Sequence, residues 1–172
     1  MADSRQQLII AAVVTRLRSL LVGSGGYTTA LATDANGDRC CRDSETHWDE
    51  ESELPAISIF EMPTEVQEHP RMRRNVIHTM PLQLKIFLKR STTAANARTA
   101  IQDVLKAIQS TGSDANDWIY ERFPEIIGGK QIGLAMETNP KRHGIEYAED
   151  TNEIVASIVE IEVKFITPKW EL

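Results

Sequence analysis

The sequence predicts an α+β domain of two layers, in which two main helices cover one face of a four-stranded, mostly antiparallel sheet. Apolar residues alternate with polar residues over positions 76–88 and again over positions 155–165. Such alternation is typical of strands with one covered face. Two further stretches carry apolar residues at helical spacing. The predicted order of elements is α-β-β-α-β-β, with both apolar faces closing on each other.

The first helix is expected over residues 4–22. Ser4 and Gln7 fit a capping box at its start, and Gly23 ends it. Residues 24–53 form a long polar excursion, within which residues 27–31 are expected to make a short strand. A loop of this length in a compact domain is usually functional or partly disordered.

The first clear strand is expected over residues 54–61, and the second covers residues 76–88. The second strand would reach about 40 Å, which is about twice the usual strand length. One end is therefore expected to project beyond the sheet as an arm. Pro81 lies inside this strand and indicates a bulge or an edge position.

The second helix is expected over residues 94–108, and a short third helix over residues 114–123. Alternating apolar residues at 132–136 predict a third strand, residues 141–150 a polar turn, and residues 153–166 the fourth strand. The side chains expected in the core are Leu17, Leu84, Ile86, Ile101, Leu105, Val159 and Val163.

The chain of 172 residues is most simply one domain, spanning residues 1–172. Its formal net charge of −6 argues against a general nucleic-acid binder, which normally carries a basic excess. No segment reads as a signal peptide or a membrane span. The two cysteines, Cys40 and Cys41, are adjacent and make no disulfide framework, so a reducing cytoplasm is expected.

No set of residues in the sequence predicts catalysis. Cys40, Cys41 and His47 are the one cluster of soft ligands, but a structural zinc site needs four ligands at suitable spacing. The four histidines are scattered, and no nucleophile–base pair follows from spacing. We therefore expect no enzyme activity, no cofactor and no metal.

Charged loops are the candidate interaction sites. The acidic stretch 43–53 includes Asp49, Glu50 and Glu51, and a short strand separates it from the basic residues Arg71, Arg73 and Arg74. A head-to-tail contact can set the acidic loop of one subunit against the basic loop of the next. These six residues are the predicted subunit-interface positions.

Several segments resemble a known family. The opening of the first helix, RQQLIIAAVVTRL at residues 5–17, and the stretch ELPAISIF at residues 53–60 are similar to tail terminator proteins of long-tailed bacteriophages, the phage lambda tail terminator-like or minor tail protein U family. The long strand, the Ala-rich helix at 94–108 and the final strand at 154–166 fit the same pattern. Residues 114–123 look like an insertion.

The resemblance implies a structural virion protein. Family members close into a hexameric ring that caps the tail tube, ends its polymerisation and offers the head a docking face. The implied partners are further copies of the chain, the tail tube protein and a head–tail connector or neck protein. DNA passes through the lumen without specific binding. The protein would be made in the host cytoplasm and reside in the tail or neck of the virion.

Other functions remain open from the residues alone. Within a phage, another neck or head-completion protein is the nearest alternative. A small α+β nucleic-acid-binding module would use Arg71, Arg73 and Arg74. A small enzyme would need a site assembled from scattered carboxylates or histidines in a deep pocket.

Overall fold

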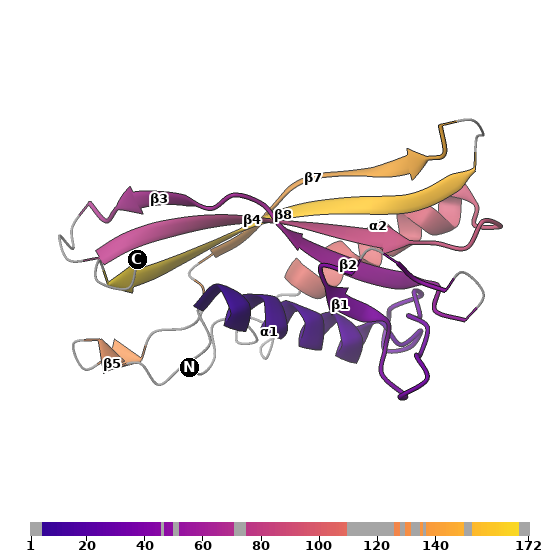
Figure 1. Ribbon diagram of the computed structural model, residues 1–172, viewed down its shortest axis with the longest axis horizontal. Coiled ribbons are helices and arrows are strands. Elements are labelled where there is room, and N and C mark those ends of the chain that lie inside the picture. The colour runs from indigo at the N-terminus through magenta and orange to yellow at the C-terminus, as the bar shows by residue number, and fades with distance from the viewer. Residues whose placement is uncertain are drawn as a thin grey trace.

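A computed structural model of the chain describes residues 5–45, 47–49, 52–70, 75–109, 126–127, 130–131, 135, 137–149 and 153–168. A long, twisted sheet lies over two helices (Figure 1). The elements in chain order are α1 (Arg5–Leu20), β1 (Cys41–Asp43), β2 (Ala56–Glu61), β3 (Glu65–Glu68), β4 (Asn75–Phe87), α2 (Ala94–Gln109), β5 (Ile126–Ile127), β6 (Lys130–Gln131), β7 (Glu137–Tyr147) and β8 (Ile154–Pro168).

The main sheet has six strands and is mixed. Its order is β1-β2-β4-β8-β7, with β3 paired to β4, and β5 and β6 form a separate two-stranded sheet. β1 runs parallel to β2, whereas the other pairs are antiparallel. The prediction of a four-stranded, mostly antiparallel sheet in the order α-β-β-α-β-β is therefore wrong. The sequence pattern missed β1, β3 and most of β7, because these short or polar strands lack a clear apolar alternation.

β2 and β3 together form one interrupted strand beside β4. Glu61 pairs with Leu82 and Glu65 pairs with Thr79, so β2 and β3 carry one extra residue across the gap. The amide of Met62 donates to the carbonyl of Pro81 at 3.0 Å. Because the N and C=O of one strand residue point to the same side, the missing donor of Pro81 also faces this irregular segment. Pro81 thus lies opposite a bulge, as its place in the sequence predicts.

The end of the sheet formed by β3, the start of β4 and the end of β8 projects past the helices (Figure 1). We call this three-stranded extension the arm. Two residues of α1 hold its base: the Arg5 guanidinium donates to the carbonyl of Ile166, and Gln6 Nε2 donates to Thr64 Oγ1 at 3.2 Å. The long β4 is present, but the expected projection beyond the sheet is wrong, because β4 pairs with β8 over its whole length and the arm projects past the helices instead.

The main core lies between the helices and one face of the sheet. α1 contributes Ile9, Val13 and Leu17, whose spacing places them on one face. The Oγ1 of Thr93 accepts the amide of Asn96 and caps α2. The core prediction is confirmed for six residues; the exception, Leu105, is only partly buried. The six are Leu17, Leu84, Ile86, Ile101, Val159 and Val163.

The segment after α1 folds back on itself. The backbone of Gly23 has a φ of +74°, which favours glycine, and the amide of Leu31 donates to the carbonyl of Leu21 at 2.9 Å. The expected strand at residues 27–31 is wrong, because this segment forms only an isolated bridge between Val22 and Ala30. Asp103 on α2 holds the segment, since its Oδ2 accepts the amides of Thr28 at 2.9 Å and Thr29 at 2.6 Å.

A second, smaller cluster lies on the other face of the sheet. It contains Cys40, Leu54 and Ala56, with Trp48 and Phe87 packed against it. Trp48 Nε1 donates to the buried Ser58 Oγ at 2.9 Å, which satisfies both polar groups. The polar excursion therefore wraps around the β1 edge of the sheet and contacts both of its faces.

The second half of the chain differs from expectation in another way. The predicted polar turn at 141–150 is wrong, because most of it belongs to β7, which pairs with β8. The predicted helix at 114–123 lies outside the described residues, as do positions 132–134 and 136 of the predicted third strand.

Candidate subunit interface

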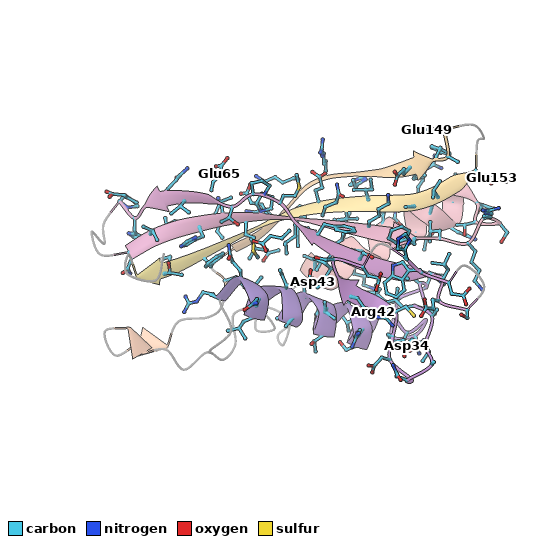
Figure 2. All side chains as sticks on the ribbon, in the orientation of Figure 1. Asp34, Arg42, Asp43, Glu65, Glu149 and Glu153 are labelled. Carbon is cyan, nitrogen blue, oxygen red and sulfur yellow. The ribbon has the colours of Figure 1, made fainter. Side chains whose placement is uncertain are left out.

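The acidic stretch 43–53 folds around a cation of its own chain. Arg42, on β1, contacts Asp34 at 2.7 Å, Glu45 at 3.5 Å and Glu53 at 3.9 Å. Its guanidinium also lies over the ring of Trp48, 4.9 Å from the centroid. Asp34 and Arg42 lie together near β1 (Figure 2). Part of the expected acidic surface is therefore neutralised within the chain itself.

Asp34 organises the turn that precedes Arg42. Its Oδ1 accepts the amides of Asn36 at 2.9 Å and Asp38 at 3.0 Å, while Oδ2 accepts from Arg42. The hydrogen bond from Arg42 is the main cause that lowers the pKa of the Asp34 carboxyl, followed by the bond from the Asp38 amide. This pair was not among the predicted sites, although the Asp-x-Asn-Gly-Asp turn at residues 34–38 was a signal for it.

Asp49, one of the predicted interface residues, is exposed but takes part in a local turn. Its carboxylate accepts from Ser52 Oγ at 2.8 Å, and its amide donates to Glu53 Oε2 at 2.9 Å. The neighbouring predictions, Glu50 and Glu51, lie outside the described residues. Asp49 remains accessible to a second subunit.

The basic predictions Arg71, Arg73 and Arg74 lie outside the described residues. The flanking residues are described: β3 ends at Glu68, β4 begins at Asn75, and the His69 amide donates to the Asn75 carbonyl at 3.1 Å. The acidic stretch begins on the same side of the sheet but nearer its middle, where Asp43 on β1 pairs with Ile59 on β2 and Ile59 pairs with Leu84 on β4.

The two cysteines are buried on opposite sides of the sheet. Cys41 belongs to the main core and Cys40 to the smaller cluster. Burial raises the pKa of the Cys41 thiol to about 12, and burial followed by the charges of Glu53 and Asp34 raises that of Cys40. His47, the third member of the soft-ligand cluster, is exposed. Within the described ranges, no group of three or more His, Cys, Asp or Glu residues is arranged to hold a metal ion.

His78 is a buried group that the sequence did not predict. It lies on β4 in the arm, with its Nε2 2.8 Å from Thr167 Oγ1 and its ring stacked on Phe165 at a centroid distance of 4.7 Å. Burial, followed by the charge of Arg5, lowers the pKa of His78. This packing makes His78 a structural residue of the arm.

The outer face of the sheet carries ion pairs between strands: among the described residues, two join the neighbours β7 and β8, and one reaches from Lys85 on β4 across β8 to Glu146 on β7. Arg142 on β7 makes two contacts with Glu160 on β8, and the hydrogen bond from Arg142 is the main cause that lowers the pKa of Glu160. Lys141 contacts Glu162 at 2.9 Å, and Lys85 contacts Glu146 at 2.6 Å. These cross-strand pairs fix the register of a solvated face.

Two grooves mark the surface of the described part. One, of about 260 Å³, lies beside the start of α2 and is lined by Thr28, Thr92, Asn96 and Leu88 among others. The other, of about 360 Å³, lies between α1 and β1. The lining of the first groove has no carboxylate, histidine or cysteine. The second lining includes Cys41 and Asp43, but Cys41 is fully buried and its raised thiol pKa makes it a poor nucleophile.

Comparisons with known proteins assign no family. No family model and no curated protein matches the chain. A solved chain whose name carries no functional description aligns with 98% of this chain and 100% of its own length, at 15% sequence identity and a TM-score of 0.38. A similarity this low carries no argument. Among the described helices, none is long and apolar enough to cross a membrane.

Proposed function

We propose that this chain is a structural virion protein of long-tailed phages, a tail terminator that assembles as a ring of six subunits. The ring would cap the tail tube, end its polymerisation and provide the docking surface for the head. The similarity of residues 5–17 and 53–60 to that family motivates the proposal. The expected absence of catalysis, cofactor and metal is part of it.

The observation that carries the proposal is the arm. It extends beyond the helices that cover the rest of the sheet (Figure 1), so it can reach a neighbouring molecule. The opposite margin of the sheet, formed by β7, differs in sequence and position. Two different surfaces on one chain suit a heterologous, head-to-tail contact, and repeated heterologous contacts close into a ring when the rotation permits.

The charge supports the proposed relation to DNA. Each subunit carries a formal charge of −6, so a ring of such subunits would repel the phosphate backbone and let DNA pass without stable binding. The proposed partners besides the chain itself are the tail tube protein on one face and a connector or neck protein on the other. The proposed location is the virion tail, after synthesis in the host cytoplasm.

The test is assembly and tail-length control. Light scattering and negative-stain microscopy should detect a closed ring, alone or on purified tail tubes, and adding the protein to polymerising tubes should fix their length. A chain that stays monomeric in both settings, and leaves tube length unchanged, contradicts the proposal. Salt-dependent binding to duplex DNA by the monomer would instead favour the nucleic-acid-binding module.

A variant tests the loops. Changing Arg71, Arg73 and Arg74 together to Glu should weaken assembly if the basic loop meets the acidic loop containing Asp49. Each exposed pair is worth about 0–1 kcal/mol, so the triple variant should show a clear but partial loss. Normal rings and normal tails in this variant would remove these loops from the interface and leave the ring proposal standing.

A further inference from the structure

Among the described strands, β3 and β7 lie at opposite margins of the main sheet. We propose that subunits join by strand addition, with β3 of one copy pairing antiparallel to β7 of the next; this inference rests on the proposed ring. Among the described strands, β3 has one neighbour, β4, and β7 has one neighbour, β8. The outer side of a strand at the margin of a sheet can pair with the backbone of another chain.

The direction of the β3 backbone can be read from its hydrogen bonds. The amide of His69 donates to the carbonyl of Asn75 on β4. Because successive residues of a strand direct their backbone groups to alternate sides, Glu65 and Gln67 face β4 as well. Val66 and Glu68 therefore direct their N–H and C=O groups toward the open edge.

The same reasoning orients β7. The amide of Leu88 donates to the carbonyl of Val155, so odd-numbered residues of β8 face β4 and even-numbered residues face β7. The partners of Ile158 and Glu160 are Gly144 and Arg142, which leaves His143 and Ile145 facing outward. Pro140 and the adjoining register shift blunt the first half of β7, and a second shift lies between Glu146 and Tyr147. The regular stretch that can pair is therefore 142–146.

One register matches the outward groups of both strands. Val66 pairs with Ile145 and Glu68 pairs with His143, since each edge offers two outward residues at the same spacing. β3 runs antiparallel to β4, β4 to β8, and β8 to β7. β3 and β7 of one copy therefore run in opposite directions. When the next copy continues the sheet, its β7 lies antiparallel to β3 of the first copy.

The side chains suit this register. Val66, at 48% exposure, and Tyr147, at 49%, are among the most exposed large apolar side chains of the described residues. Val66 would pack on the partly buried Ile145, and Tyr147 lies just beyond the second register shift of β7. Glu65 would lie opposite Glu146, whose carboxylate already contacts Lys85 at 2.6 Å.

β1 also lies at a margin of the sheet, but it fits this role less well. It has only three residues, and the carbonyl of Cys41 already accepts from Arg18 Nε at 3.0 Å. Its pairing with β2 is limited to Ile57–Ile59, so it leaves the outer edge of β3 uncovered. The edges of β3 and β7 are therefore the two that can meet.

A disulfide experiment tests the register. Facing residues of an antiparallel pair have Cα atoms about 5.5 Å apart, within disulfide range. The chain with Glu68→Cys and His143→Cys should form an intermolecular ladder under mild oxidation, ending at the size of the ring. β4 and β8 separate the two positions within one subunit, at about 4.8 Å per strand, which prevents an internal bond. The native cysteines are buried. The control pairs Glu68→Cys with Glu149→Cys, which lies at the β7–β8 hairpin (Figure 2), and should give no ladder.

Edge variants supply the second measurement. Val66→Pro removes an amide that faces outward and spares the bonds to β4, so it should abolish assembly while leaving the thermal melt close to that of the parent chain. Glu68→Lys and His143→Glu should each weaken assembly at least about 10-fold, and the double variant should restore it, as expected for a complementary pair. Glu153→Lys, an exposed charge change away from both edges, is the matched control.

The outcomes separate the two proposals. Closed parent rings with no ladder, and with normal assembly of Val66→Pro, overturn the strand pairing and leave the ring in place. A ladder that grows into open filaments supports the pairing and overturns the ring of six. A parent chain that stays monomeric with and without tail tubes, and forms no ladder at high concentration, overturns both.

Discussion

Removal of the Asp103 carboxylate should destabilise the fold substantially. Asp103 is 6% exposed, and its Oδ2 accepts two backbone amides from the segment that follows α1. Hydrogen bonds to a charged group are worth about 1.5–3 kcal/mol each. Thr29 is buried, so its amide would lose its partner without access to water, whereas Thr28 is exposed and can bind water. We therefore expect Asp103→Ala to lower the free energy of unfolding by about 2–4 kcal/mol.

Urea unfolding followed by circular dichroism measures this change. Asp103→Asn retains one acceptor oxygen and should cost less than the alanine variant. Gln102→Ala, an exposed change on the same helix, is the matched control and should stay within about 0.5 kcal/mol of the parent. A loss below about 1 kcal/mol for Asp103→Ala, or equal losses for the alanine variant and the Gln102 control, would show that these hydrogen bonds do not hold the segment on α2.

Three further predictions concern the core, the thiols and pH. Leu84→Ala should cost about 2–5 kcal/mol in unfolding free energy, and Leu105→Ala clearly less, because Leu84 is fully buried and Leu105 only partly; equal losses in urea titrations would contradict this assignment. Since the pKa of Cys41 is raised to about 12, its alkylation by iodoacetamide at pH 8 should be at least about 100-fold slower in the native chain than in the unfolded one, by mass spectrometry; equal rates would disprove its burial. The pKa values of Asp34 and His78 are both lowered in the fold, so the folded chain binds fewer protons than the unfolded one. As the pH is lowered, stability should therefore decrease below about 6.5 through His78 and below about 3.8 through Asp34. In thermal melts, His78→Phe should reduce the slope of stability against pH between about pH 7 and about pH 5. The same slope in this variant and in the parent chain would contradict the His78 assignment.

The sequence predicted the elements whose apolar periodicity is strong. α1, α2, β4 and β8 all bury one face, and their repeat patterns place them within a few residues of their observed bounds. The local sequence is enough to predict such elements, because the residues on the buried face must be apolar and must recur at the helical or the strand period. The unusual length of β4 was also predicted, since it has 13 residues, more than twice the usual number; length alone did not show that β3 and β8 keep its start within the sheet.

The missed strands depend on tertiary contacts. β7 contains Pro140 and Gly144, both poor strand formers, yet it pairs with β8 along most of its length and is fixed by the contact of Arg142 with Glu160. β1 is a three-residue strand, and its position depends on how the polar segment 24–53 packs against β2. Neither pairing has a local signal, because context outweighs intrinsic preference in strands.

The candidate interface shows why counting charges along a sequence predicts a contact surface poorly. The acidic stretch looked available to a partner, yet Glu45 and Glu53 already contact Arg42, whose side chain also packs on Trp48. A carboxylate with an internal cation gains little from a second one, because its charge is already compensated and its side chain already ordered. Backbone edges are different, since the direction of the outer N–H and C=O groups of a marginal strand does not depend on its side chains. The edges of β3 and β7 are therefore the stronger basis for an interface, and the charged loops would then tune its orientation more than its affinity.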